Sequence, residues 1–346
     1  MIKVVNSASA IAMSVVMVLA LFLYITPITA GKAEAEAPSA VTAAASVDVL
    51  FSSGSKKVTG KYIIRKDCIL PEGATLTVKD GGRLYIMPGA ELTVKGALKV
   101  SSGGAVYVQG DVNVAETGII SCTGNLKIQK SGCVSLGGKL SVNKGGKVYG
   151  MGTLSVLNEF SDISCKGDVT AKIKAPEPVE KDGVTTIGGI IIVNREFSLP
   201  EDYGSGLVRS AYNAYLQMKK ASGYDMEIVS GYRSYQKQEE TFAYWEKIDG
   251  FEKASTYSAQ PGHSEHQTGL AIDITSLNQT YGNTPEGKWL AAHCWEYGFI
   301  LRYPKNGEKI TGYIYEPWHV RYLGKSTAKL VHDSGLTLEE FLGVDR

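Results

Sequence analysis

The segment ALKVSSGGAVYVQG, residues 97–110, is followed without a gap by three segments of the same length and pattern. These are DVNVAETGIISCTG (111–124), NLKIQKSGCVSLGG (125–138) and KLSVNKGGKVYGMG (139–152), and a fifth unit, 153–167, is one residue longer. A constant period without insertions is typical of a chain that stacks one small structural unit on the next. This repeat decides the fold of the N-terminal half.

Each repeat unit carries apolar residues at its second and fourth positions, namely Leu98/Val100, Val112/Val114, Leu126/Ile128, Leu140/Val142 and Leu154/Val156. Alternation with period two predicts short strands that bury one face. Glycine ends each unit and recurs in its middle, where we expect sharp turns. Two strands and two turns per unit predict one coil of a β-solenoid, whose stacked coils bury their Leu and Val side chains together. The alternative, an up-and-down meander, rarely keeps so constant a spacing.

The repeat also sets the domain boundaries. We expect the solenoid over residues 56–173, and its outward Lys, Ser, Asn and Tyr positions show no catalytic cluster, so its role would be spacing or binding. Residues 31–55, which are rich in Ala, Ser and Val, are expected to form a spacer. The segment KAPEPVEKDG, 174–183, is rich in proline and charge and is predicted to be a linker. A second domain would then occupy 184–346.

The N-terminus has the pattern of an export signal. A weak positive region at Lys3 precedes an apolar run over residues 10–25, and small residues follow it, so cleavage is expected after Ala30 or within 33–37. The alternative is an uncleaved membrane anchor, because no charge interrupts the chain between Lys3 and Lys32. With residues 1–30 as a signal peptide or an anchor, the remainder is expected outside the cytoplasm.

The composition is that of a globular protein. The 346 residues favour two domains, and 44% are hydrophobic while 21% are charged. A formal net charge of +1 gives no basis for binding nucleic acid. The five cysteines contain no CxxC pair, which argues against a thiolate zinc site and favours buried free thiols.

The C-terminal half has a different pattern, with helices interspersed among few strands. The expected elements are a helix over 205–222, strands over 225–230 and 270–275, a helix that begins at Thr284-Pro285-Glu286 and ends before Gly298, and a short last helix. Thr337 and Glu340 would form a capping box at the start of that last helix. Because the elements show no regular βαβ alternation, this half is predicted to be an α+β domain.

Three short segments of this half carry candidate chemistry: SGYRS (230–234), SEHQTGLAID (264–273) and EPWH (316–319). Two imidazoles, His266 and His319, together with the carboxylate of Asp273 would be a sufficient set for a catalytic zinc ion that keeps a fourth position for water. Glu316, close to His319, could activate that water. From spacing alone the two histidines and Asp273 could equally be satisfied core residues, since no HExxH helix is present.

The same segments resemble the zinc D-alanyl-D-alanine carboxypeptidases, most closely the VanY type. SEHQTGLAID matches that family's S-x-H-x-x-G-x-A-x-D motif, EPWH matches its E-x-x-H motif, and SGYRS matches its arginine-bearing turn. The resemblance extends over roughly residues 186–325, including IIIVNREFSLPEDY and EYGFILRYP, and does not reach the solenoid.

The resemblance implies a role for each motif residue. His266, Asp273 and His319 would be the Zn²⁺ ligands, Glu316 the general base and acid, and Arg233 an electrophilic contact to the substrate. A guanidinium is permanently charged and donates in a fork, which suits carbonyl and carboxylate oxygens. Two further residues, Ser264 and Gln238, are weaker candidates for substrate contacts. Ser264 could equally cap a turn, and Gln238 could be an exposed helix residue.

The expected protein is therefore an exported zinc carboxypeptidase that hydrolyses the terminal D-alanine from peptidoglycan stem peptides, with both D,D- and L,D-specificity open. Its site would be extracellular, in the cell wall or anchored on the outer face of the cytoplasmic membrane, and the solenoid could bind the wall. One alternative is a peptidoglycan endopeptidase that cuts within stems or cross-bridges. Another is a non-catalytic cell-wall binding protein, although such a protein would not need a complete metal set.

Overall fold

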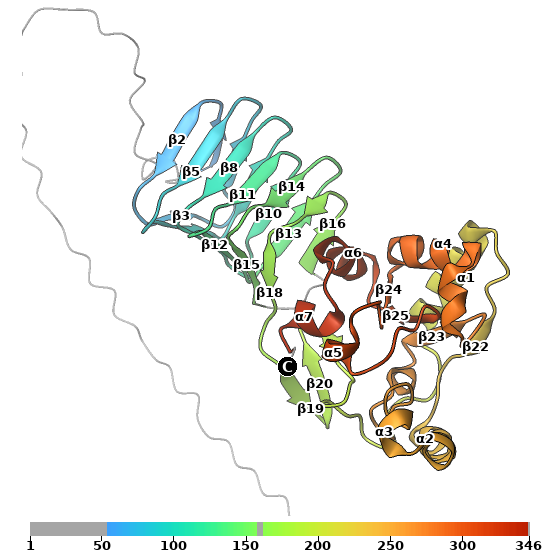
Figure 1. Cartoon of the computed structure of the whole chain (residues 1–346). Coiled ribbons are helices and arrows are strands. Elements are labelled where there is room, and N and C mark those ends of the chain that lie inside the picture. The colour runs from blue at the N-terminus through green and yellow to red at the C-terminus, as the bar shows by residue number, and fades with distance from the viewer. Residues whose placement is uncertain (1–53, 158–161, 345–346) are drawn as a thin grey trace, which may run out of the picture. The chain divides into compact units, whose positions relative to one another are not determined.

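A computed structural model describes residues 54–157 and 162–344 (Figure 1). The predicted export signal and nearly all of the predicted spacer lie outside the described residues, as does part of the fifth repeat unit. Among the helices that are described, none combines the length and the apolar character that crossing a bilayer requires.

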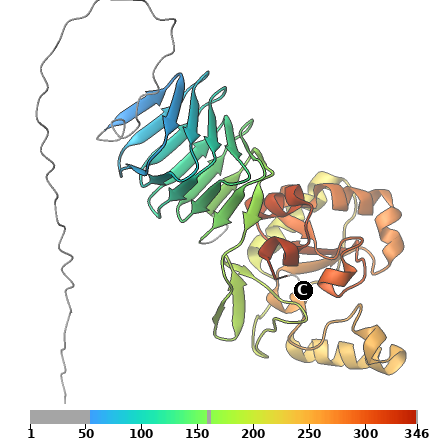
Figure 2. The same cartoon turned by 60° about the vertical axis from the view of Figure 1, so that its left-hand side comes forward.

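The N-terminal half is a β-solenoid, as predicted, and it is built from three parallel six-stranded sheets (Figure 2). The first sheet contains β1 (Ser55–Val58), β4 (Thr75–Val78), β7 (Ala97–Val100), β10 (Ile119–Cys122), β13 (Lys139–Val142) and β16 (Ile163–Cys165). The second contains β2 (Lys61–Ile64), β5 (Arg83–Ile86), β8 (Ala105–Val108), β11 (Asn125–Ile128), β14 (Lys147–Tyr149) and β17 (Asp168–Val169). The third contains β3 (Cys68–Leu70), β6 (Glu91–Val94), β9 (Asp111–Val114), β12 (Cys133–Leu136), β15 (Thr153–Val156) and β18 (Lys172–Lys174). Parallel pairing throughout excludes the meander.

The size of one coil differs from the prediction. Ala97 pairs with Ile119, and Ile119 pairs with Lys139, so successive coils take 22 and then 20 residues. Each coil has three sides, whereas one 14-residue sequence unit supplies only two strands. The prediction that one unit forms one coil is therefore wrong, and three units close two coils. The sequence repeat spans two of the three sides of a coil, because every side has the same local pattern of residues.

The interior of the solenoid is a set of apolar columns. The second and fourth residues of each strand from β4 to β13 are buried, and Leu76, Leu98, Ile120 and Leu140 stack on one another with 0% exposure. The glycines in the middle of the repeat units are required for a reason other than the sharp turns that were expected. Gly118 does not have a positive φ, but a Cβ there would lie 2.1 Å from the carbonyl oxygen of Val94. Close stacking of the coils therefore requires glycine at this corner.

No disulfide is present in the described part of the chain, where all five cysteines are found. Cys122, Cys165 and Cys294 are buried, as expected of thiols that act as small apolar residues, while Cys68 and Cys133 are half-buried. Burial raises the pKa of Cys122 and Cys165 to about 11, which keeps both thiols protonated at neutral pH.

The segment predicted to be a linker, residues 174–183, leads from β18 into a small antiparallel sheet. This sheet has the order β19 (Val179–Lys181), β20 (Val184–Ile187) and β21 (Ile190–Ile191). Half of the segment is therefore a strand or a turn of this sheet, and Asp182 and Gly183 adopt positive φ between β19 and β20.

The C-terminal half is an α+β domain, as predicted. Its sheet is antiparallel, in the order β22 (Ile228–Ser230), β23 (Ala271–Ile274), β25 (His319–Tyr322) and β24 (Phe299–Leu301). The helices are α1 (Arg209–Ser222), α2 (Tyr235–Asp249), α3 (Phe251–Ala254), α4 (Pro285–His293), α5 (Glu308–Thr311), α6 (Lys325–Ser334) and α7 (Leu338–Leu342). Three 3₁₀ turns, η3 (Glu265–Thr268), η4 (Gln279–Asn283) and η5 (Cys294–Tyr297), complete it. The capping box of Thr337 and Glu340 is confirmed at the start of α7.

The last solenoid coil does not end in solvent. Apolar residues of α6 and α7, namely Ala328, Leu330, Val331, Leu338, Phe341 and Leu342, belong to the same buried cluster as the solenoid columns. Helix α6 lies against β16 and β17, and α7 lies against β18. A solenoid needs its final coil covered, since otherwise that coil would leave its apolar interior exposed.

Candidate metal and catalytic site

The central strands of the C-terminal sheet place two of the predicted ligands side by side. Asp273 on β23 and His319 on β25 are directly opposite each other in the antiparallel register. All four residues of β23 are buried, because this strand lies between β22 and β25 and is covered on both faces. The Oδ1 atom of Asp273 lies 3.1 Å from Nδ1 of His319. The two side chains are 4% exposed, so both are held in the domain interior.

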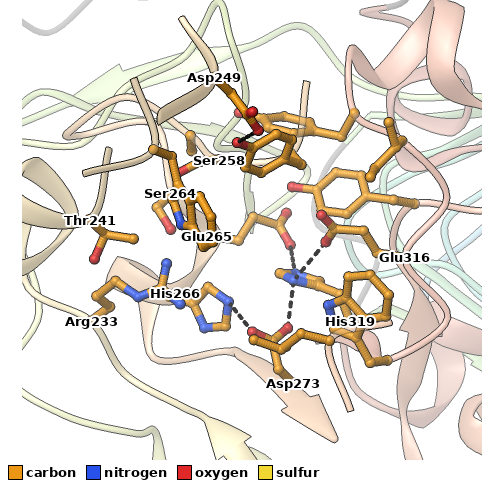
Figure 3. A pocket seen from close by; sticks show the side chains of 18 residues that line it. Arg233, Thr241, Asp249, Ser258, Ser264, Glu265, His266, Asp273, Glu316 and His319 are labelled. Carbon is orange, nitrogen blue, oxygen red and sulfur yellow. Dashed lines mark hydrogen bonds and ion pairs between the residues drawn. The ribbon is translucent and has the colours of Figure 1, made fainter. Parts of the chain in front are cut away.

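His266 reaches the same point from the turn η3, which leads into β23. The turn ends at Gly269, whose φ is +66°, and a Cβ there would lie 2.2 Å from the carbonyl oxygen of Gly206. Nδ1 of His266 lies 2.7 Å from the carbonyl oxygen of Gly231. Because a carbonyl only accepts, Nδ1 carries the proton and Nε2 of the neutral ring presents a lone pair. That nitrogen lies 3.1 Å from Oδ2 of Asp273 (Figure 3).

These three residues form a donor set that fits a metal ion. One ligand atom from each of His266, Asp273 and His319 lies within 4.8 Å of the others, and all three residues are buried. Oδ1 of Asp273 is buried without a hydrogen-bond partner in the described part of the chain. Two neutral imidazoles and one carboxylate are typical of catalytic zinc, which retains an open position. The residues present therefore fit the zinc ion that the sequence motifs imply.

The electrostatics of the three residues reflect burial and their mutual proximity. Burial lowers the pKa of His266, although the carboxylate of Asp273 opposes this. Burial would also lower the pKa of His319, but the nearby carboxylates of Asp273 and Glu265 raise it to about 9. The pKa of Asp273 is lowered because the two imidazoles outweigh its desolvation. A metal ion bound here would replace the proton that lies between Nδ1 of His319 and Asp273.

Glu316 lies beside the donor set on the turn that precedes β25. The backbone N–H of His319 donates to the carbonyl oxygen of Glu316 at 3.2 Å, so the EPWH segment forms a turn. Oε2 of Glu316 lies 3.6 Å from Nδ1 of His319. Burial raises the pKa of Glu316 to about 8, although neighbouring His319 opposes the shift. A carboxyl group with this tendency to take up a proton suits general acid–base work.

Arg233 approaches from the opposite side, at the end of the turn before α2. Its NH2 group donates to Oγ of Ser230 at 2.7 Å, and its NH1 group donates to Oε1 of Gln238 at 2.8 Å. Its backbone N–H donates to the carbonyl oxygen of His266. Burial lowers the pKa of this guanidinium, while Asp273 and Glu316 favour its charge. The side chain is thus held in one orientation and lines the cavity.

The structure corrects the prediction for Gln238. Its side chain is 0% exposed and does not line the cavity, so it is neither an exposed helix residue nor a direct substrate contact. Its Nε2 atom donates to the carbonyl oxygen of Ala259 at 2.6 Å, and its Oε1 atom accepts from Arg233. Gln238 therefore orients Arg233 from behind. Ser264, by contrast, lines the cavity and makes no side-chain cap to η3.

The cavity that these residues share has a volume of about 400 Å³. It is lined by the metal-donor residues, Glu316, Arg233 and Ser264. Four aromatic residues outside the three motifs line it as well, namely Trp245, Tyr257, Tyr303 and Tyr313. The segment EYGFILRYP contains Tyr303, but nothing in its local pattern indicates which side chain faces the site. The cavity thus combines polar reactive groups with aromatic side chains.

A fold and a site of this kind define the chain's C-terminal half as a metallopeptidase-like domain. The sequence profile of the VanY family, described as D-alanyl-D-alanine carboxypeptidase, matches residues 205–325. Residues 205–325 thus form a VanY-type domain. The sequence resemblance inferred from the three motifs is thereby confirmed.

Individual relatives are similar to this chain over part of their length. Carboxypeptidase YodJ of Bacillus subtilis strain 168 is 45% identical over 162 residues, which are 44% of this chain and 59% of YodJ. A D-alanyl-D-alanine carboxypeptidase of Enterococcus faecium is 37% identical over 115 residues, 33% of this chain and 35% of that protein. The chain thus spans less than two thirds of either relative. A solved structure of the LD-carboxypeptidase LdcB is 38% identical, covers 49% of this chain and 94% of its own, and has a TM-score of 0.44.

Proposed function

We propose that residues 184–346 form a zinc-dependent carboxypeptidase that removes the terminal D-alanine from peptidoglycan stem peptides. One observation carries this proposal: three metal-donor side chains, the carboxylate of Glu316 and the guanidinium of Arg233 converge on one cavity. The match to the VanY family supports the substrate class. The complete donor set supports an enzyme over a silent binding domain.

The residues divide the work of amide hydrolysis among them. Zinc held by His266, Asp273 and His319 would supply Lewis acidity, which polarises a carbonyl and acidifies water. Glu316 accepts the proton of the water that attacks the last peptide carbonyl. When the C–N bond breaks, Glu316 returns that proton to the departing nitrogen of D-alanine. Arg233 is held by Ser230 and Gln238 and stabilises the negative charge that develops on the carbonyl oxygen.

Defined muropeptides test this function and its specificity. The purified chain is incubated with soluble pentapeptide and tetrapeptide stems, with and without a chelator, and the products are weighed by mass spectrometry. Loss of one alanine from the pentapeptide alone identifies D,D-specificity, and loss from the tetrapeptide identifies L,D-specificity. Cuts inside the stem would identify an endopeptidase and overturn the proposal. Full activity in excess chelator would remove the metal from it.

We also propose that the protein is exported and that the solenoid holds it in the cell wall. The apolar run over 10–25 supports export. Residues 55–174 carry 17 Lys and Arg against 9 Asp and Glu, a formal net charge of +8, which suits the anionic polymers of a bacterial wall. The full chain should sediment with purified walls at low salt and be released at high salt. A full-length variant in which the exposed Lys99, Lys139 and Lys147 are replaced by Glu should stay in solution, and sedimentation equal to that of the wild type would contradict the wall-binding role.

A further inference from the structure

Glu265 lies within the SEHQTGLAID motif but has no role in the chemistry described above. Its side chain is 0% exposed and lies between two guanidinium groups that are themselves almost completely buried. Oε1 accepts from Nε of Arg302 at 2.8 Å and from NH1 of Arg321 at 2.7 Å. Both guanidiniums are permanently charged and lie in direct contact with Oε1, so they hold the enclosed carboxylate in its ionised form.

The second oxygen of this carboxylate faces the metal-donor set. Oε2 of Glu265 lies 3.5 Å from Nε2 of His319, and neither atom has a hydrogen-bond partner among the residues that the structure describes. The other ring nitrogen of His319, Nδ1, lies 3.1 Å from Oδ1 of Asp273. His319 thus has one nitrogen directed at the donor set and the other directed at a charged acceptor (Figure 3).

We propose that Glu265 is a positioning residue for His319. An imidazole that binds a metal through Nδ1 must carry its proton on Nε2. A charged carboxylate beside Nε2 accepts that proton in a hydrogen bond, selects this tautomer and makes the ring a stronger ligand. Glu265 borders the cavity, but its side chain is 0% exposed, so it would act through His319 and not on the substrate. This inference rests on the proposed zinc site.

The surrounding network explains how a charge can be held there, and it offers a matched control. Arg302 donates through NH1 and NH2 to both oxygens of Glu339 on α7, at 2.8 and 2.6 Å. Two carboxylates and two guanidiniums therefore balance one another in the interior. Glu339 shares Arg302 with Glu265, but among the described residues it makes no hydrogen bond or ion pair with His319. A change at Glu339 should disturb the same buried network without touching the metal ligand.

The experiment compares Glu265→Gln and Glu339→Gln in the full-length chain. Because the glutamine oxygen would accept from the two arginines, its NH₂ group would face Nε2 of His319 and could only donate. After removal of metal, zinc is titrated back in competition with a chromophoric chelator, and the visible spectrum of the cobalt(II) form is recorded. We expect Glu265→Gln to weaken zinc binding by about 10- to 100-fold and to shift the cobalt bands. Glu339→Gln should change zinc affinity by less than about threefold, even if it lowers the melting temperature as much as Glu265→Gln does.

Two results would overturn the proposal: wild-type zinc affinity in Glu265→Gln, or parallel losses of affinity and melting temperature in both variants. If Glu265→Gln does not fold, nitrogen-15 spectra of the histidines in the zinc-loaded wild type decide the matter. They should show metal on Nδ1 and a proton on Nε2 of His319, and the opposite tautomer would exclude the role. A wild-type chain that binds zinc but cleaves no muropeptide refutes the proposed function and leaves this measurement intact. A wild-type chain that binds no zinc refutes both.

Discussion

The two halves of this protein have interiors of opposite composition. In the described part of the solenoid no polar or charged side chain is buried, and Leu, Val and Ile fill the interior in columns. In the C-terminal domain the largest fully buried side chains are Arg302 and Arg321, paired with Glu265 and Glu339. The surfaces also differ, because residues 55–174 have a formal charge of +8 and residues 175–346 a formal charge of −6. The solenoid interior is thus held by apolar packing alone, whereas the interior of the C-terminal domain also contains paired charges beside its candidate site.

The largest effect should come from removing a metal ligand, which tests whether the C-terminal domain depends on its polar interior. His319→Ala removes one of three protein ligands, so zinc content and turnover should fall together to background. The solenoid shares no residue with the site, and its β-sheet circular dichroism should persist. Elemental analysis beside a muropeptide assay measures both quantities. Turnover without bound zinc would disprove the metal site.

The next largest effect separates the general base from the ligands. Glu316→Gln keeps the shape of the side chain and a hydrogen-bonding group but cannot accept a proton. We expect near-stoichiometric zinc and a loss of about 100-fold or more in turnover, as is typical when a general base is removed. The same elemental analysis and assay apply. Loss of zinc from this variant would make Glu316 a ligand, and near-normal turnover would exclude it from the mechanism.

A core substitution in the solenoid should lower stability without changing turnover. Leu126→Ala removes a side chain with 0% exposure from an interior column and should cost about 2–5 kcal/mol of solenoid stability. Turnover of soluble muropeptides should be unchanged, since the site lies in the other half. Lys130→Ala, at an exposed turn, is the matched control and should change stability by less than about 0.5 kcal/mol. Urea unfolding followed by circular dichroism measures both, and a turnover loss in Leu126→Ala would show that the halves are coupled.

The smallest expected effect concerns the residue behind Arg233. Gln238→Ala removes one of the two side chains that hold this guanidinium, and loss of a buried hydrogen bond should lower kcat/KM about tenfold without loss of zinc. Gln236→Ala, an exposed glutamine on the same helix, should leave kcat/KM unchanged. Steady-state kinetics on one muropeptide compares the two. Equal activities would mean that Ser230 alone positions Arg233.

Local patterns predicted most of the elements because those elements depend on neighbours in the sequence. Alternating apolar residues indicated the solenoid strands, and Thr337 with Glu340 indicated the start of α7. The motifs indicated His266, Asp273, His319 and Glu316 through their resemblance to a known family. Asp273 and His319 are 46 positions apart in the sequence, and only the register of β23 against β25 brings them opposite each other.

What the sequence determined by itself was therefore the identity of the strands and caps, since these follow from residue type and short spacing, whereas the reactive groups were indicated by the resemblance of three motifs to a known family. Tertiary structure alone decided how many strands close one coil, because all three sides have the same pattern and nothing local counts them. It also decided that Gln238 supports Arg233 instead of facing the cavity. Glu265 is the clearest case, because its partners Arg302 and Arg321 are 37 and 56 residues away. A buried charge is stable only when distant parts of the chain bring the opposite charge to it.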